Sequence, residues 1–176
     1  MKLQTIILSS LIVGSVSLSA QQLSEATCRC CSLDRFYSPW MKDLPRPKMR
    51  QFLGNAQLKI TTKSEKAQAY FNQGLNCLHG FWEFEAYRYF LAAVEEDPEC
   101  AMAYWGLCMS IPGKIVEAKE ERKLALKKAT ELATAVSEHE KLYIESLELL
   151  LLQGAKSATT KLEKIIIYIK SNAYVI

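Results

Sequence analysis

The chain of 176 residues is long enough for one domain of ordinary size, and a hydrophobic content of 49% is sufficient for a core. Seven glycines and five prolines are too few for a loop-rich or disordered chain. A net charge of +3 gives no reason to expect nucleic acid as a partner, and His79 and His139 are the only histidines. The sequence also has no glycine-rich phosphate loop, His-Glu-x-x-His pattern or nucleophile elbow. We therefore expect a protein that is not an enzyme and uses no cofactor.

The first residues have the features of a secretory signal peptide. Lys2 precedes an apolar run that ends in small residues at Ser19 and Ala20. We predict that residues 1–20 are removed near Gln21 and that the protein is exported, to a periplasm or to the medium. The alternative is a retained membrane anchor, although the apolar part is short and rich in serine for a span of about 20 residues.

Residues 21–61 form a leader segment that is predicted to be irregular, because prolines interrupt it. It contains Cys28, Cys30 and Cys31. Three thiols this close could ligate a soft metal, but zinc sites usually add a second, separated pair of ligands. Disulfide bonding in an oxidising compartment is the simpler interpretation, and the six cysteines of the chain allow fifteen full pairings. We assign no metal site.

Residues 62–176 are predicted to form an all-α domain of about six helices. The first helix begins after a cap at Thr62 or Ser64 and ends near Leu78, and Glu65 would complete a capping box with Thr62. Apolar periodicity, caps and breakers place the others at about 82–96, 98–110, 116–136, 142–153 and 155–171. A second capping box, Ser137 to Glu140, precedes the fifth helix.

The first two helices carry a pattern of small and aromatic residues. Tyr70 and Gly74 lie on one side of the first, Ala86 and Phe90 repeat this geometry on the second, and Pro98 follows. The order and spacing resemble the tetratricopeptide repeat of 34 residues, W-x2-L-G-x2-Y, then A-x3-F, then P. The small residues predict a close approach of the two helices, with Gly74 facing Ala86. The pattern is not matched at Gln73 and Cys77.

The segment from about Phe52 to Ile111 closely resembles a family of exported bacterial tetratricopeptide repeat proteins. The specific pieces are ITTKSEKA, AQAYFNQGL and DPECAMAYWG. The resemblance implies an α-solenoid of antiparallel helix pairs, and it carries over no catalytic residues, because most of the family is uncharacterised. Members often have an Asn-His pair where this chain has Trp82 and Glu83. Members are also usually longer, with further repeats.

The predicted last helix is apolar on more than one face. Its apolar residues and those that follow are Ile165, Ile166, Ile167, Ile169, Val175 and Ile176. A solenoid normally ends in a helix with a polar outer face. We therefore expect either that the chain is a fragment of a longer repeat array or that it self-associates through this helix.

A protein- or peptide-binding scaffold is the function that this sequence favours, with a partly apolar segment as the partner. In tetratricopeptide stacks the first helix of each pair lines the concave surface. The candidate groove residues are Gln68, Phe71, Asn72, Leu75, His79, Met102, Trp105, Met109, Lys141, Ile144, Glu145 and Glu148. Trp105 is the expected anchor. The alternative is that the apolar members are core, covered by the leader or by neighbouring helices. The alternative function is redox or metal handling by Cys28, Cys30 and Cys31.

Overall fold

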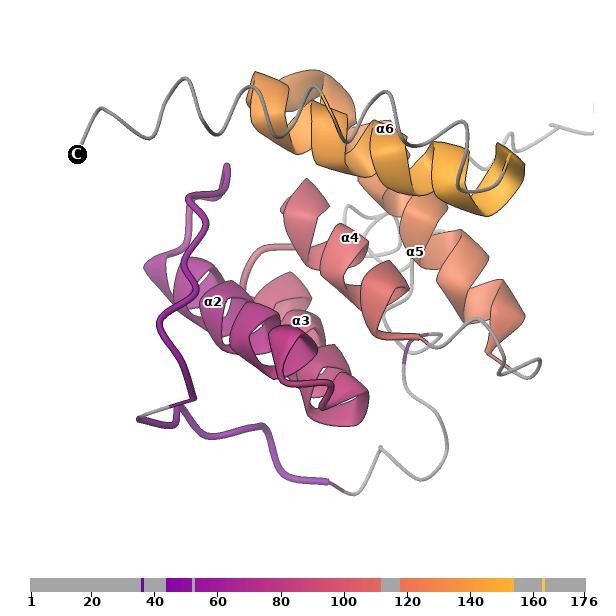
Figure 1. Ribbon diagram of the computed structural model, residues 1–176. Helices are drawn as coiled ribbons and strands as arrows, with labels where there is room; N and C mark the ends of the chain where they lie inside the picture. Colours follow the sequence, from indigo (N-terminus) through magenta and orange to yellow (C-terminus); the bar gives the residue numbers. More distant parts are fainter. Residues whose placement is uncertain (1–35, 37–43, 52, 112–117, 154–162, 164–176) are drawn as a thin grey trace, which may run out of the picture. The chain divides into compact units, whose positions relative to one another are not determined.

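Helices dominate the computed structural model, which describes residues 36, 44–51, 53–111, 118–153 and 163 (Figure 1). The α-helices are α2 (Glu65–His79), α3 (Glu83–Glu96), α4 (Ala101–Ser110), α5 (Lys119–Leu132) and α6 (Glu138–Gln153), and a 3-10 helix, η3, spans Ala133–Ala135. These residues form no strand, so the all-α prediction is confirmed for the described part of the chain. The predicted signal peptide and the three leader cysteines lie outside it, as does the predicted last helix apart from Glu163.

The hydrogen bonds of two polar residues determine where α2 and α4 begin. Ser64 caps α2, because its Oγ accepts the N–H of Ala67 at 3.2 Å. The α4 helix begins at Ala101 and not at Pro98 as predicted, because Asp97 holds the intervening residues in a turn. Its side chain accepts the N–H of Glu99 at 3.1 Å, and its carbonyl accepts that of Cys100 at 3.0 Å.

The predicted ends of the next two helices were wrong by several residues. The helix expected over 116–136 is described from Lys119, and it ends at Leu132, where η3 follows. The helix expected from residue 142 begins at Glu138, directly after Ser137, whose N–H donates to the Glu140 carboxylate at 3.0 Å. The capping box therefore located the start of α6 better than apolar periodicity did.

The core is built round the ring of Phe90 on α3, which two glycines approach from neighbouring helices. A Cβ added at Gly74 on α2 would lie 2.8 Å from this ring, and one added at Gly106 on α4 would lie closer still. The three atoms nearest to such a Cβ at Gly74 all belong to Phe90, so Phe90 is a close partner of Gly74. The predicted approach of Gly74 to Ala86 stays a prediction. Phe71 adds a ring contact with Phe90, with centroids 5.5 Å apart.

The helices pack in chain order: α2 against α3, α3 against α4, and α4 against α5 (Figure 1). Fully buried alanines repeat along this order, with Ala86 on α3 and both Ala125 and Ala129 on α5. Small residues at these positions allow the helices to approach closely. No helix among the described residues has the length and apolar character needed to cross a lipid bilayer.

Candidate functional site

Residues 54–63 run along α2 as an extended segment, here called the clasped segment (Figure 1). Asn76 binds both backbone polar groups of Ala56: its Oδ1 accepts the N–H, and its Nδ2 donates to the carbonyl, both at 2.9 Å. One turn earlier, the Oδ1 of Asn72 accepts the N–H of Leu58 at 3.4 Å. The carboxamide of Asn76 thus offers Ala56 the donor and acceptor that a neighbouring strand would offer in a sheet.

Gln68 extends this pattern by another turn of the helix. Its Oε1 accepts the N–H of Ile60 at 3.0 Å, and its Nε2 donates to the carbonyl of Leu58 at 2.9 Å. Gln68, Asn72 and Asn76, here called the amide ladder, are four residues apart, which is about 6 Å along a helix. The residues that they bind are two apart, about 6.6 Å along an extended chain. Because the two spacings nearly match, each turn of α2 can hold two residues of the segment.

Side chains of the clasped segment alternate between core and solvent. Ile60 is buried, and Ala56 and Leu58 are half-buried against the core, whereas Gln57 and Lys59 are exposed. This alternation is the period-two pattern of an extended chain with one apolar face. The segment is therefore held by its backbone polar groups and by every second side chain.

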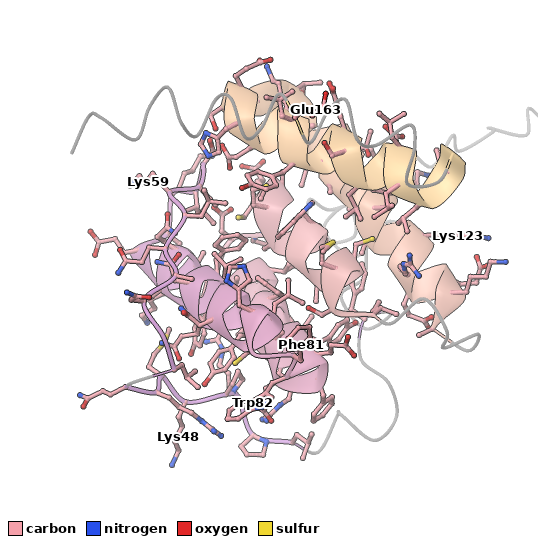
Figure 2. All side chains as sticks on the ribbon, in the orientation of Figure 1. Lys48, Lys59, Phe81, Trp82, Lys123 and Glu163 are labelled. Carbon is pink, nitrogen blue, oxygen red and sulfur yellow. The ribbon has the colours of Figure 1, made fainter. Side chains whose placement is uncertain are left out.

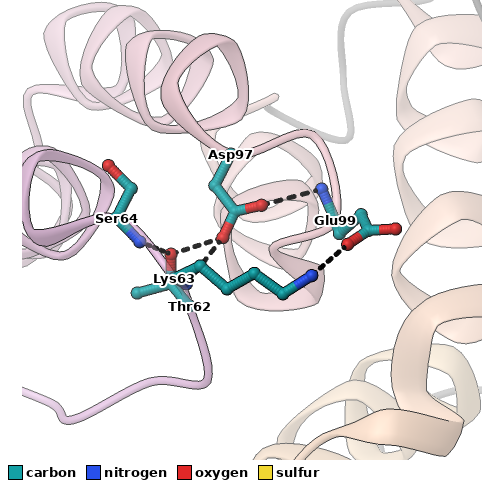
Figure 3. A network of polar contacts seen from close by, with 5 residues as sticks. All are labelled: Thr62, Lys63, Ser64, Asp97 and Glu99. Carbon is teal, nitrogen blue, oxygen red and sulfur yellow. Dashed lines mark hydrogen bonds and ion pairs between the residues drawn. The ribbon is translucent and has the colours of Figure 1, made fainter.

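Asp97 holds the end of the segment that leads into α2 (Figure 3). Its Oδ2 accepts the Thr62 hydroxyl at 2.5 Å and the Lys63 N–H at 3.1 Å. The Thr62 hydroxyl in turn accepts the N–H of Ser64 at 3.1 Å, so Thr62 contacts Asp97 and is not the cap of α2. An exposed ion pair of 3.0 Å between Lys63 and Glu99 lies beside this network.

Glu140, near the start of α6, binds Thr61. It accepts the Thr61 N–H at 2.7 Å and the Thr61 hydroxyl at 2.6 Å, and it also accepts the N–H and the hydroxyl of Ser137. Next to it, the His139 Nε2 lies 3.0 Å from the carbonyl oxygen of Lys59. The clasped segment is therefore attached to α6 as well as to α2.

Both carboxylates that hold the segment are buried, yet both favour the charged form. Burial acts to raise the pKa of Asp97, but hydrogen bonds from Thr62 and from backbone N–H groups outweigh it, and the pKa is lowered. The pKa of Glu140 is lowered in the same way: bonds from Ser137 and Thr61 outweigh the effect of burial. Each carboxylate thus remains a hydrogen-bond acceptor well below neutral pH.

Most of the predicted groove residues do not form open surface. Five of them belong to the core: Phe71, Leu75, Met102, Trp105 and Ile144. Their side chains fill the space between helices; Trp105, for example, packs edge-on against Tyr143 with ring centroids 5.6 Å apart. Gln68 and Asn72 are half-buried and bind the clasped segment. The others are exposed (His79 and Met109) or half-buried (Lys141, Glu145 and Glu148).

Four residues of this site were not among the predicted ones: Asn76, Asp97, His139 and Glu140. Asn76 could have been found, because it continues the four-residue spacing of Gln68 and Asn72. Glu140 had a visible local role in the sequence, as part of a capping box, and Asp97 directly precedes the helix breaker Pro98. The contact of Asp97 with Thr62 spans 35 residues and that of Glu140 with Thr61 spans 79, and no local pattern indicates them.

Three cysteines in the described part of the chain are free and buried, Cys77, Cys100 and Cys108. Burial raises the pKa of Cys100 to about 12 and that of Cys108 to about 11. It also raises the pKa of Cys77. Because the thiolate is the reactive form, these positions suit packing and not redox chemistry. No group of three or more His, Cys, Asp or Glu residues in the described ranges is placed to hold a metal ion.

Comparisons with known proteins add no relative to this picture. No protein-family model matches the chain, and neither a characterised protein nor a solved structure matches it. The resemblance to exported tetratricopeptide proteins therefore rests on the sequence pieces ITTKSEKA, AQAYFNQGL and DPECAMAYWG, and it stays a prediction.

Proposed function

We propose that this chain is an exported binding scaffold of the tetratricopeptide type, which holds an extended peptide segment along α2. The observation that carries the proposal is the amide ladder. It binds the backbone groups of Ala56, Leu58 and Ile60, which every peptide has, and it does not depend on particular side chains at these positions. A surface that binds one extended segment in this way suits another of similar pattern.

The contacts of the clasped segment indicate which peptides would fit. Small or apolar side chains at every second position would take the places of Ala56, Leu58 and Ile60. Hydroxyl residues in the places of Thr61 and Thr62 would donate to Glu140 and Asp97. The preferred ligand is therefore an extended stretch of alternating pattern that ends in two hydroxyl residues.

In the structure the chain's own clasped segment fills this site. A segment tethered by a short linker competes at an effective concentration of about millimolar. A second peptide therefore binds well only if it makes more contacts than residues 54–63 or if those residues are first released.

Two further observations support the tetratricopeptide type. The helices pack as α2 with α3 and α4 with α5, as consecutive helix pairs would. Small buried residues recur on the second helix of each pair, at Ala86 and Ala125. Export is proposed from residues 1–20 alone, which have the charge and apolar run of a signal peptide.

The test uses a fluorescent peptide with the sequence of residues 54–63, GNAQLKITTK, and the full chain. Ala56→Pro in the chain removes the N–H that Asn76 accepts, and so weakens the tethered segment without changing α2. We expect this variant to bind the peptide more tightly than the unaltered chain does, measured by fluorescence anisotropy. Adding Asn76→Ala to the same variant should remove the gain.

A matched control peptide carries N-methyl groups at the residues equivalent to Leu58 and Ile60. These groups remove the two N–H donors that the amide ladder accepts. The proposal fails if Ala56→Pro does not improve binding, or if the methylated peptide binds as well as the unmodified one.

A further inference from the structure

His139, in the first turn of α6, lies between the clasped segment and the capping box of Ser137 and Glu140. Its Nε2 is 3.0 Å from the carbonyl oxygen of Lys59, and its Nδ1 is 3.1 Å from the Oγ of Ser137. Figure 2 labels Lys59 on the clasped segment, near the beginning of α6. Each ring nitrogen of His139 therefore has a polar partner, one on the segment and one before the helix.

The partners of the ring determine where its hydrogens lie. A carbonyl oxygen can only accept, so the contact with Lys59 requires a hydrogen on the His139 Nε2. Ser137 has a single hydroxyl hydrogen, and its Oγ also contacts the Glu140 carboxylate. Burial acts to raise the pKa of Glu140, but hydrogen bonds outweigh it and lower the pKa. This carboxylate is therefore charged near neutral pH and accepts the Ser137 hydrogen.

A second ring hydrogen follows from this count. Since Ser137 gives its hydrogen to Glu140, its Oγ can only accept from the ring, and the Nδ1 must then carry a hydrogen as well. A histidine with hydrogens on both nitrogens is a cation. A neutral ring would lose the bond to Lys59 or the bond to Ser137, or it would take the Ser137 hydrogen away from Glu140. All of these hydrogen bonds exist together only while His139 is charged.

Charged residues along the chain and on the contacting elements act on the ring in both directions. On α6 they are Glu138, Glu140 and Lys141, on the clasped segment Lys59, and at the end of α3 Asp97. The N–H groups in the first turn of a helix oppose a cation, and so do the two lysines. The three carboxylates favour one, and that of Glu140 is buried and so the least screened by solvent. The charges thus nearly balance, and the hydrogen-bond partners decide the state of the ring.

We propose that His139 is a pH-sensitive latch, which holds residues 59–61 on α6 while its ring is charged and releases them when the ring loses a proton. Histidine normally changes its charge between about pH 5 and pH 8. The complete set of bonds holds one proton more than the released state, so within this range it is favoured at lower pH and lost as pH rises. The carboxylates of Asp97 and Glu140 act in the opposite sense and in more acidic solution.

The latch would control when the clasped segment leaves the amide ladder. In that role it rests on the proposed peptide binding, because only a second peptide makes use of the vacated site. As a property of the segment itself it needs no added peptide. The experiment therefore measures the segment directly, so that a failure of peptide binding and a failure of the latch give different results.

Hydrogen exchange of the full chain at about pH 6 and about pH 8 tests the latch. Each rate is divided by that of an unstructured peptide at the same pH. The Thr61 amide, which donates to Glu140 at 2.7 Å, should lose about threefold to tenfold in protection at the higher pH, the equivalent of one hydrogen bond. The Ala56 amide, which Asn76 holds, should keep its protection.

Three variants assign the change to the ring. His139→Gln keeps a donor and an acceptor but cannot change its charge, so protection at Thr61 should be equal at the two pH values. His79→Gln is the matched control and should keep the full change, since His79 is the only other histidine and is exposed at the end of α2. Ser137→Ala removes the acceptor beside Nδ1, so that a neutral ring can still donate to Lys59 and the change should shrink.

The latch is overturned if protection at Thr61 in the unaltered chain is the same at both pH values. It is also overturned if His139→Gln shows the same change as the unaltered chain, or if His79→Gln abolishes it. An undiminished change in Ser137→Ala would likewise overturn it, because the charge of the ring would then not depend on the capping box.

Discussion

Asn76 and Ala56, 20 residues apart in the chain, share two hydrogen bonds of 2.9 Å that run in opposite directions between side chain and backbone. A segment without secondary structure of its own still needs partners for its N–H and carbonyl groups. Here side chains of α2 are those partners. The position of the clasped segment is thus fixed by hydrogen bonds as well as by its apolar side chains.

Asn76→Ala is expected to lower the free energy of unfolding by about 1.5–4.5 kcal/mol, since three hydrogen bonds of about 0.5–1.5 kcal/mol each are lost, two with Ala56 and one with the Asn72 carbonyl. Urea denaturation measures the loss. Hydrogen exchange should locate it: the amide of Ala56 should exchange faster, while amides in α3 and α4 keep most of their protection.

Asn55→Ala is the control for this variant, because the Asn55 side chain is exposed and adjacent to the same backbone. We expect a change within about 0.5 kcal/mol. Equal losses for both variants, or unchanged exchange at Ala56 in Asn76→Ala, would show that the amide ladder does not hold the segment.

The carboxylates of Asp97 and Glu140 should make stability depend on acid pH. Both have a lowered pKa in the folded chain, against usual values of 3.8 and 4.5. The unfolded chain therefore binds protons more readily in this range, and stability rises with pH until both states are ionised. We expect full stability above about pH 5 and a progressive loss below it, as pH falls through the folded values.

Melting temperatures measured from about pH 3 to pH 6 test this dependence. Glu140→Gln and Asp97→Asn should be less stable at pH 6 and should show a flatter decline toward acid. Glu99→Gln should leave the profile almost unchanged, because the Lys63–Glu99 pair is exposed. A profile that remains as steep without Glu140 and Asp97 would assign the acid sensitivity to other groups.

Local patterns in the sequence were enough to predict α2 and α3 but not the clasped segment. The cap at Ser64 and the break at Asp97 place α2 and α3 to within about three residues, because they act over one turn. No cap or break of this kind marks the position of the clasped segment. Its place depends on partners on α2 and α6, and the bond between Thr61 and Glu140 spans 79 residues.

Periodicity also could not separate core from groove. An apolar stripe at helical spacing is the same whether it faces a neighbouring helix or an open surface. Phe71 and Trp105 were predicted to line a groove for this reason, and both are buried. Two features of the sequence could have indicated that an extended segment covers α2. One is the side-chain amides at every fourth position, Gln68, Asn72 and Asn76, and the other is the alternating apolar residues of 56–60.

Gly74→Ala and Gly106→Ala should both destabilise the core, although alanine favours a helix. An added Cβ would come within 2.8 Å of the Phe90 ring at Gly74 and closer at Gly106, and Phe90 is fully buried. Overpacking of this kind costs about 1–3 kcal/mol. In a Phe90→Leu background each alanine should cost less, and a double-mutant cycle measures the coupling. If each alanine costs the same in the Phe90→Leu background as in the unaltered chain, the Phe90 ring is not the reason that these positions require glycine.

Native thiol labelling separates the scaffold from the redox alternative. Cys77, Cys100 and Cys108 are buried with raised pKa values, so a thiol reagent at about pH 8 should not modify them until the chain unfolds. Peptide mapping by mass spectrometry identifies the labelled positions. Fast labelling at Cys28, Cys30 or Cys31 would favour redox or metal chemistry in the leader. Fast labelling at Cys100 would contradict the buried core described here.

The left-handed backbone at Phe81, with φ of 59°, leads to a prediction about stability. Phe81→Gly should raise the free energy of unfolding by about 1 kcal/mol, because a left-handed residue with a side chain costs about 1–2 kcal/mol and glycine offsets part of this gain by its freedom in the unfolded chain. Phe81→Ala is the matched control: it removes the ring but keeps the Cβ in the same conformation, with φ of 59°. Urea denaturation should therefore show a gain for glycine and almost none for alanine. An equal gain in stability for both variants would assign the effect to loss of the exposed ring and not to the backbone. A loss of stability for Phe81→Gly would show that the Phe81 ring stabilises the turn although it is 87% exposed.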